Sequence, residues 1–163
     1  MTEPTAQRGF PLLPSRLSRG SKATKTTDHT AAALLLTSKA YADKNGLKPR
    51  GRVVAYANQG DCPTLMLNAP VPAAKKVLEK AGLTKDDIDV WEINEAFAVV
   101  AEKFIRDLEL DRSKVNINGG ACALGHPIGA SGARIIVTLL GALRHHGLRR
   151  GVASLCIGGG EAT

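Results

Sequence analysis

The feature that most constrains the fold of this chain is the alternation of two apolar patterns after residue 27. Short apolar runs rich in β-branched residues alternate with longer segments in which apolar residues recur at helical spacing, as Val100, Phe104 and Leu108 do. The longer segments are typical of helices, and the continuous short runs are typical of strands covered on both faces. We therefore expect an α/β fold, with a mostly parallel sheet covered by helices.

Local signals give the expected element boundaries. We expect helices over residues 31–44, 72–81, 95–108 and 133–146, and strands over residues 52–57, 88–93, 114–117 and 152–157. Asp28 can cap the first helix and Asn94 the third. Pro72 suits the first turn of the second helix, and Gly82 suits its end.

The composition indicates a globular protein. Of the 163 residues, 44% are hydrophobic and 23% are charged, which is ordinary for a soluble domain. We divide the chain into a loose arm without periodicity, residues 1–27, and a single domain, residues 28–163. No apolar run approaches the roughly 20 residues that span a bilayer.

Charge and cysteine content exclude several classes of function. The net charge of +7 predicts a basic surface. We expect no nucleic-acid partner, because the basic residues are not interleaved with aromatic ones as in modules that bind single strands. Cys62, Cys122 and Cys156 match no zinc or disulfide spacing, so we expect no metal site and a cytoplasmic location. The arm is rich in Arg, Ser and Thr, which leaves a mitochondrial or peroxisomal location open.

Three segments combine reactive side chains with permissive backbone: residues 94–97, the glycine-rich stretch 119–132, and residues 156–160. Each follows a predicted strand, where open α/β sheets place their ligand crevices. His126, held between Gly125 and Pro127, can act as a base or a hydrogen-bond donor. The Cys156 thiol can exchange protons with a nearby His, and the N–H of Gly158 can stabilise an oxyanion.

Each of these residues also has a purely structural interpretation. Asn94 is placed to cap a helix, His126 to occupy a turn, and Cys156 to pack as a small buried hydrophobe. The glycine-rich stretch does not fit the spacing of nucleotide-binding loops. Composition and spacing alone therefore predict an α/β domain with a candidate Cys/His site.

Taken together, the three segments resemble the thiolase family. Asn94-Glu95-Ala96-Phe97 is similar to that family's Asn-Glu-Ala-Phe motif, and residues 118–134 resemble its Gly-His-Pro loop and the helix that follows. Cys156-Ile157-Gly158 resembles its Cys-x-Gly motif. The order and spacing of the motifs agree over residues 28–163. The resemblance implies the C-terminal domain of an acetyl-CoA acetyltransferase or a 3-ketoacyl-CoA thiolase.

The resemblance implies reversible Claisen condensation and cleavage of 3-ketoacyl-CoA, with the acyl group carried on a cysteine. His126 would activate that cysteine and, with a water held by Asn94, form one oxyanion hole. Cys156 would move the proton at the α-carbon of the substrate, and the N–H of Gly158 would contribute to a second oxyanion hole. A CoA thioester would be the substrate, with no bound cofactor.

The sequence also departs from the family pattern. Nothing in it matches the N-terminal half that carries the acyl cysteine, residues 21–25 replace the loop that contacts CoA, and the chain stops at Thr163, where the final strand is expected. Cys62 and Cys122 lie outside the acyl-cysteine motif and are expected to pack as small hydrophobes.

These departures leave the enzyme assignment of the chain alone open, and we assign no CoA-binding residues. We expect the chain to need a nucleophile-bearing half from elsewhere, and to act as a homo-oligomer or with a partner thiolase-type chain. The alternative is a non-catalytic thiolase remnant that binds CoA or a partner.

Overall fold

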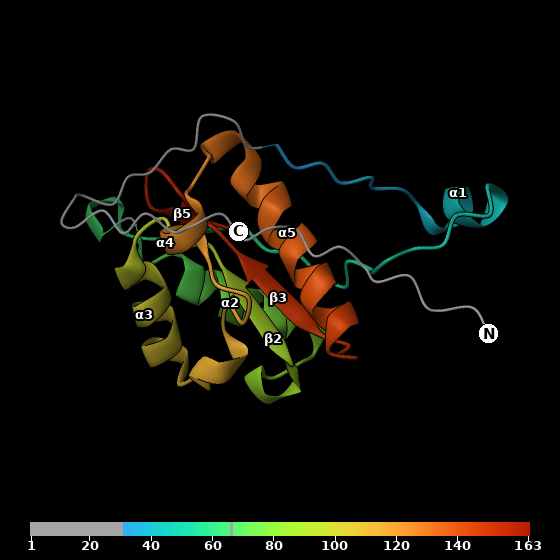
Figure 1. The fold of residues 1–163 in the computed structure, drawn as a ribbon. Coiled ribbons are helices and arrows are strands. Elements are labelled where there is room, and N and C mark those ends of the chain that lie inside the picture. Colours follow the sequence, from blue (N-terminus) through green and yellow to red (C-terminus); the bar gives the residue numbers. More distant parts are fainter. Residues whose placement is uncertain (1–30, 66) are drawn as a thin grey trace, which may run out of the picture.

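The computed structural model describes residues 31–65 and 67–163, and Figure 1 shows their arrangement. The predicted arm, residues 1–27, and the predicted cap Asp28 lie outside the described residues. Helix α1 (Lys39–Lys44) stands apart from the other elements in Figure 1. The other helices and strands form an α/β unit, which confirms the predicted fold class.

The parallel part of the fold is a pair of strands, β2 (Val90–Ile93) and β3 (Gly151–Ser154), in which Ile93 lies opposite Ser154. All four residues of β2 are buried. A strand covered on both faces can carry apolar residues at every position. The apolar run over residues 88–93 therefore predicts this strand correctly.

A second sheet, which is antiparallel, has the strand order β1–β5–β4, formed by Gln59–Gly60, Glu161–Ala162 and Cys156–Ile157. The prediction of a single strand over residues 152–157 is therefore wrong, because this segment contributes to two strands, β3 and β4, that lie in different sheets. Leu155 separates them, since both its N–H and its C=O pair with Thr163. Alternation of patterns along the chain cannot predict this pairing.

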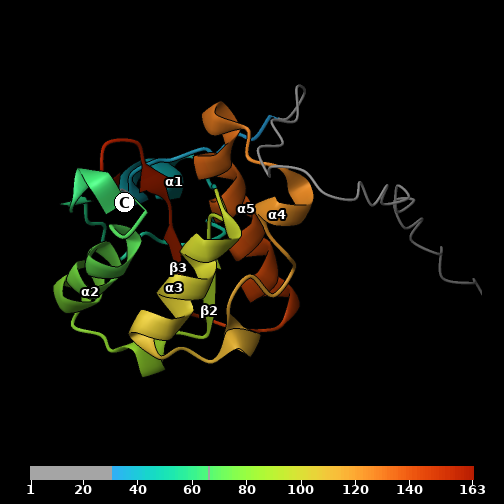
Figure 2. The same cartoon turned by 90° about the vertical axis from the view of Figure 1, so that its left-hand side faces the viewer.

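Three helices cover the two faces of the β2–β3 pair (Figure 2): α2 (Pro70–Ala81), α3 (Ala98–Leu108) and α5 (Ile128–His145). Successive side chains of a strand point to opposite faces. Val90 therefore packs against Leu139 and Ala142 of α5, whereas Trp91 and Ile93 face α2 and α3. None of the helices in the described part of the chain is long and apolar enough to cross a membrane.

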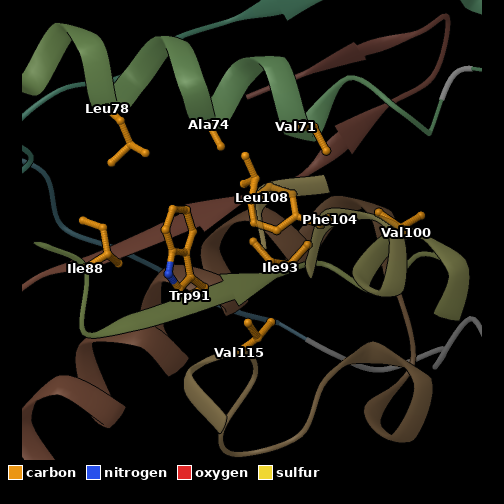
Figure 3. Close-up of a cluster of buried hydrophobic side chains, with 10 residues drawn as sticks. All are labelled: Val71, Ala74, Leu78, Ile88, Trp91, Ile93, Val100, Phe104, Leu108 and Val115. Atoms are coloured by element: carbon orange, nitrogen blue, oxygen red, sulfur yellow. The ribbon is translucent and has the colours of Figure 1, made fainter. Parts of the chain in front are cut away.

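The main hydrophobic core lies between β2 and the α2–α3 layer (Figure 3). Its buried members are Val71, Ala74, Leu78, Ile88, Trp91, Ile93, Val100, Phe104, Leu108 and Val115. The rings of Trp91 and Phe104 meet edge to face with their centroids 5.6 Å apart. Because this contact ties β2 to α3, it restrains the segment between them, residues 94–97.

The helix predicted over residues 72–81 is confirmed as α2, and Gly82 ends it in the left-handed region with φ 65°. The helix predicted over residues 95–108 begins only at Ala98, and the predicted Asn94 cap is wrong. The N–H of Asn94 donates instead to the carbonyl of Ser154 at 2.9 Å. Pairing with β3 thus keeps Asn94 in line with β2 and out of the helix.

The helix predicted over residues 31–44 is wrong in its first half, because only α1 forms. The side chain of Ser38 caps α1 by accepting from the N–H of Tyr41. Leu35 and Leu36, which precede it, are 83% and 77% exposed. A short helix without tertiary packing is marginal, so an apolar pattern with nothing to pack against does not extend it.

The strand predicted over residues 52–57 is also wrong. Val53, Val54 and Tyr56 are exposed, and within the described ranges the segment has no strand partner. Its β-branched and aromatic residues favour a pleated, half-buried surface. Without a neighbouring strand to pair with, this preference does not produce a strand.

The strand predicted over residues 114–117 is reduced to a single parallel bridge between Val115 and Trp91. Asp111 starts a 3-10 helix, η3 (Arg112–Lys114), by accepting from the N–H of Ser113. Asn116 then takes a positive φ of 48°, which ends the extended backbone. Two further 3-10 helices are η1 (Pro63–Leu65) and η2 (Lys85–Asp87).

The glycine-rich stretch 119–132 is more helical than its composition indicates. It contains α4 (Ala121–Leu124), and α5 begins at Ile128 with Pro127 as its N-cap, earlier than the predicted residue 133. Glycine lowers helix propensity by only about 1 kcal/mol per residue, and the packing of α5 on the strands outweighs that cost.

Removing the Phe104 ring tests the main core. Phe104→Ala should lower the free energy of unfolding by about 3–5 kcal/mol, because it leaves a cavity against Trp91. Val99→Ala is the matched control on the same helix, since Val99 is 59% exposed and its loss should cost less than about 0.5 kcal/mol. Urea denaturation measures both, and equal effects would contradict the described core.

Candidate functional site

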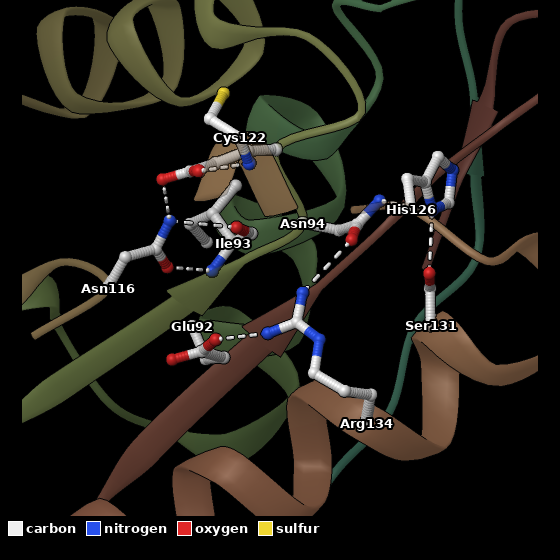
Figure 4. Close-up of polar contacts among 9 residues, drawn as sticks. Glu92, Ile93, Asn94, Asn116, Cys122, His126, Ser131 and Arg134 are labelled. Carbon is white, nitrogen blue, oxygen red and sulfur yellow. Dashed lines mark hydrogen bonds and ion pairs between the residues drawn. The ribbon is translucent and has the colours of Figure 1, made fainter. Parts of the chain in front are cut away.

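Asn94 lies at the carboxyl end of β2, fully buried, and its side chain is held by α5 (Figure 4). A guanidinium N–H of Arg134 donates to Asn94 Oδ1 at 3.3 Å. Since a guanidinium can only donate, this contact fixes which end of the amide faces Arg134. The amide nitrogen, Nδ2, therefore faces His126, 3.4 Å from Nδ1 of the ring.

His126 precedes α5 and is half-buried. Its Nδ1 lies 2.6 Å from the hydroxyl of Ser131, and Ser131 is fully buried on the first turns of α5. Desolvation and the nearby Arg134 charge both lower the pKa of His126 below its ordinary 6.5. The ring is therefore neutral at neutral pH and can accept a proton.

Glu92 anchors Arg134 from the middle of β2. Its Oε1 accepts from the Arg134 guanidinium at 2.8 Å, and the carboxylate is fully buried. Its second oxygen, Oε2, has no hydrogen-bond partner among the described residues. Burial raises the pKa of Glu92 to about 7, although the Arg134 charge acts in the opposite direction.

A second polar cluster holds the segment that follows Asn94. The carboxylate of Glu95 accepts from Asn116 Nδ2 at 2.8 Å and from the N–H of Cys122 at 2.9 Å. The amide of Asn116 also pairs with both backbone groups of Ile93. Gly120 lies so close that a Cβ there would collide with the Glu95 carboxylate. Glu95 therefore ties the end of β2 to the glycine-rich stretch.

Of the predicted site residues, the structure brings Asn94 and His126 into contact, and it places Cys156 in β4 of the antiparallel sheet and Gly158 in the turn that follows. Cys156 begins β4 and packs against the main core on the α2–α3 side, so burial raises the pKa of its thiol. Gly158 lies in the exposed turn between β4 and β5, with open space around its Cα.

The expectation that Cys62 and Cys122 pack as small hydrophobes is wrong, because both are exposed. Cys62 precedes η1 on the surface, and Cys122 lies in the first turn of the short α4. Neither position is covered by a helix or strand of the described chain. No group of three or more His, Cys, Asp or Glu side chains within residues 31–65 and 67–163 is arranged to hold a metal ion.

Sequence reasoning missed the residues that hold the site in place. These are Glu92, Glu95, Asn116, Ser131 and Arg134. Glu92 carried a usable signal, since a charged residue inside an apolar strand is rarely buried without a partner. Ser131 lies four residues after Pro127, a spacing at which a helical hydroxyl reaches back to a carbonyl. The partners of Asn116 lie too far away in the sequence to be predicted from local pattern.

The fold and this group of residues define an α/β domain with polar groups gathered at the carboxyl ends of its central strands. Residues 47–163 match the family described as "Thiolase, C-terminal domain". The chain belongs to the thiolase family, as its C-terminal domain. The match begins after α1 and includes every residue of the candidate site.

Curated relatives agree with this assignment. The chain is 55% identical over 135 residues to an acetyl-CoA acetyltransferase of Syntrophomonas wolfei, covering 82% of this chain and 34% of that protein. It is 52% identical over 130 residues to the cytosolic acetyl-CoA acetyltransferase of Mus musculus, covering 80% of this chain and 33% of that protein. The chain thus spans about a third of the length of the curated relatives it matches.

Solved structures share the fold. The crystal structure of the Bacillus anthracis acetyl-CoA acetyltransferase superposes with a TM-score of 0.75 at 47% identity, over 77% of this chain and 32% of that one. Human mitochondrial 3-ketoacyl-CoA thiolase gives a TM-score of 0.75 at 46% identity, with the same coverage of both chains.

The buried Glu92 carboxyl should make stability depend on pH. Its pKa of about 7 in the folded chain exceeds its ordinary 4.5, so the unfolded chain loses the proton first as pH rises. The stability of the wild type should therefore fall between pH 4.5 and 7, by about 3 kcal/mol relative to Glu92→Gln. Urea denaturation of both chains across this range measures the difference.

Glu102 is the control, because its contribution to stability should change with pH in the opposite direction to that of Glu92. Its hydrogen-bonded pair with Arg112 lowers the pKa of this exposed carboxyl. Any stability that Glu102 contributes relative to Glu102→Gln is therefore present at neutral pH and lost as pH falls. If the difference in stability between the wild type and Glu92→Gln did not change between pH 4.5 and 7, the Glu92 carboxyl would be ionised in the folded chain over this whole range.

Gly120→Ala tests the Glu95 cluster. The added methyl group would displace the carboxylate from Asn116 and Cys122, which should lower the free energy of unfolding by about 1–3 kcal/mol. Gly141→Ala is the control, because a Cβ at this exposed position of α5 meets nothing within 4 Å and should stabilise the helix by about 0.5–1 kcal/mol. Thermal and urea denaturation report both; a loss in neither variant would contradict the role of Glu95.

Proposed function

We propose that this domain supplies the proton-handling residues of a thiolase-type acyltransferase that condenses or cleaves 3-ketoacyl-CoA. The observation that carries the proposal is the close approach of the Asn94 amide to His126 at the carboxyl end of β2. Cys156 begins β4, just after β3, the strand that pairs with β2. The family membership and the names of the relatives support the reaction class.

In this proposal His126 accepts the proton of a nucleophilic cysteine and then donates to the oxyanion of the acyl intermediate. Its lowered pKa keeps the ring neutral, as a base at neutral pH requires. The amide of Asn94 is oriented by Arg134 and presents its N–H groups toward His126. A water bound beside this amide would complete the oxyanion hole.

Cys156 would act as the acid and base at the α-carbon of the substrate. Burial raises the pKa of its thiol, so the group holds a proton that it can give to a carbanion. Gly158 lies in the exposed turn after β4, and in this proposal its N–H donates to a thioester oxygen. Charge developing on that oxygen is stabilised most by donors already in place.

The proposal includes an acyl-CoA substrate and a nucleophile-bearing N-terminal half provided by a second polypeptide. The chain would act as a homo-oligomer or with a partner thiolase-type chain. Neither Cys62 nor Cys122 is assigned that role, because neither lies in a stretch that resembles the family's acyl-cysteine motif. We also propose a cytoplasmic location; the relatives include one protein named cytosolic and one named mitochondrial.

The test is cleavage of acetoacetyl-CoA by coenzyme A, measured for the chain alone and after mixing with the N-terminal half of the Syntrophomonas wolfei acetyl-CoA acetyltransferase. We expect turnover in the mixture, and a loss of about 10²–10⁴-fold in His126→Ala and Cys156→Ala. Cys62→Ser is the matched control and should keep full activity, because the exchange is small and the Cys62 side chain is exposed.

Turnover that survives both His126→Ala and Cys156→Ala would refute the proposed site. Absence of turnover in every mixture, with coenzyme A still bound in calorimetry, would favour the non-catalytic CoA-binding remnant instead.

A further inference from the structure

The hydroxyl of Ser131 contacts two polar atoms at once. Its Oγ lies 2.6 Å from His126 Nδ1 and 3.0 Å from the carbonyl oxygen of Pro127. Ser131 is fully buried, so water does not compete for either contact. The 3.0 Å contact lies at the long end of the normal range for an O–H···O hydrogen bond, and the 2.6 Å contact is slightly shorter than the usual range for N–H···O. At such distances each contact is attractive only with a hydrogen between the atoms.

The number of hydrogens available for these two contacts determines which ring nitrogen of His126 carries the proton. The Ser131 hydroxyl has one hydrogen, and the carbonyl of Pro127 has none. When the hydroxyl donates to Pro127, as helical serines do to the carbonyl four residues earlier, the hydrogen between Oγ and the ring must come from His126 Nδ1. When the hydroxyl donates to the ring instead, two oxygens are left facing each other at 3.0 Å.

The contact with Asn94 weakly opposes this arrangement, because Asn94 Nδ2 and a protonated Nδ1 are both donors, but it is the weaker of the two contacts at Nδ1. Arg134 turns the amide so that Nδ2 faces the ring, but the Nδ2–Nδ1 separation is 3.4 Å, longer than the usual 2.7–3.2 Å. The single lone pair of an unprotonated Nδ1 would also have to accept from Asn94 and Ser131 together. The contact at 2.6 Å therefore outweighs the one at 3.4 Å.

We propose that Ser131 is a positioning residue that holds neutral His126 in its Nδ1–H tautomer, with the hydrogen-bond chain running from the ring to Ser131 and on to the Pro127 carbonyl. This leaves the lone pair of Nε2 free, so Nε2 is the nitrogen that takes a proton from a thiol. The proposal rests on the proposed function for its catalytic meaning, but the tautomer itself is a property of this chain.

Nitrogen-15 NMR of the imidazole rings tests the tautomer in the full chain, at about pH 8, above the ordinary pKa of histidine. The chain has 4 histidines, and the His126→Gln spectrum assigns the signals of His126. We expect a pyrrole-type Nδ1 and a pyridine-type Nε2 for His126. His145 and His146 are exposed internal controls and should favour the Nε2–H form, as neutral imidazole does in water.

Ser131→Ala removes the acceptor for Nδ1–H, and the His126 signals should move toward those of His145 and His146. Ser131→Thr keeps the hydroxyl and should restore the Nδ1–H pattern. A wild-type His126 in the Nε2–H form, or an Nδ1–H form that persists in Ser131→Ala, would overturn the proposal. Because the wild-type spectrum is itself a test, the proposal stays falsifiable if a variant does not fold.

The complemented cleavage assay separates this inference from the proposed function. There, Ser131→Ala should lower kcat by about 10–100-fold with little change in KM, by analogy with the partners that orient metal-bound histidines, and Ser131→Thr should recover most of the lost kcat. The predicted tautomer without turnover in any mixture supports the role of Ser131 and refutes only the proposed function. Full kcat in Ser131→Ala would overturn the role of Ser131 while leaving the proposed function intact.

Discussion

The rest of this structure depends on β2 being buried on both faces. Its four residues alternate between two cores, so that Trp91 and Ile93 pack toward α2 and α3 while Val90 and Glu92 face α5. Asn94 comes next in this alternation and also faces α5, where Arg134 meets it. One residue of register shift in β2 would send Asn94 to the opposite core, so the pairing of Ile93 with Ser154 positions the site as much as any polar contact does.

The ion pair of Glu92 with Arg134 is better explained by positioning than by stability. Taking both charges out of water costs several kcal/mol per ion before their attraction offsets it, and Glu92 Oε2 remains without a partner in the described chain. An apolar pair of similar volume would fill the same space. It could not orient Asn94, however, because the remaining donors of the Arg134 guanidinium are what select the end of that amide that faces His126. The ion pair thus gives the Asn94 amide a defined orientation at a cost in stability.

The sequence correctly predicts elements that are specified by local signals. It fails for elements that form only when a distant part of the chain pairs with them. The apolar run at 88–93 and the Pro and Gly at the ends of α2 are local, and both predictions are confirmed. Residues 52–57 have the same β-branched character as a strand, but a strand requires a neighbour that composition does not reveal. The candidate site follows the same division. The residue types of Asn94, His126 and Cys156 indicate a candidate site from the sequence alone. The contacts of Ser131 with His126 and of Glu92 with Arg134 form only in the folded chain, so the sequence does not predict them.

Desolvation gives the two candidate proton carriers complementary states. Burial lowers the pKa of His126 and raises the pKa of Cys156, and in both cases the neutral form gains. At neutral pH the ring then lacks its second proton, while the thiol retains its own. Under the proposed function these are the states that the chemistry requires, because an attacking thiol needs a base and a departing carbanion needs an acid. Cys156 owes its state to contact with the main core on the α2–α3 side. His126 owes its state to partial burial and to Arg134, on the α5 side. The acid and the base therefore owe their protonation states to different parts of the fold, so a substitution in the main core should change the pKa of Cys156 without changing that of His126.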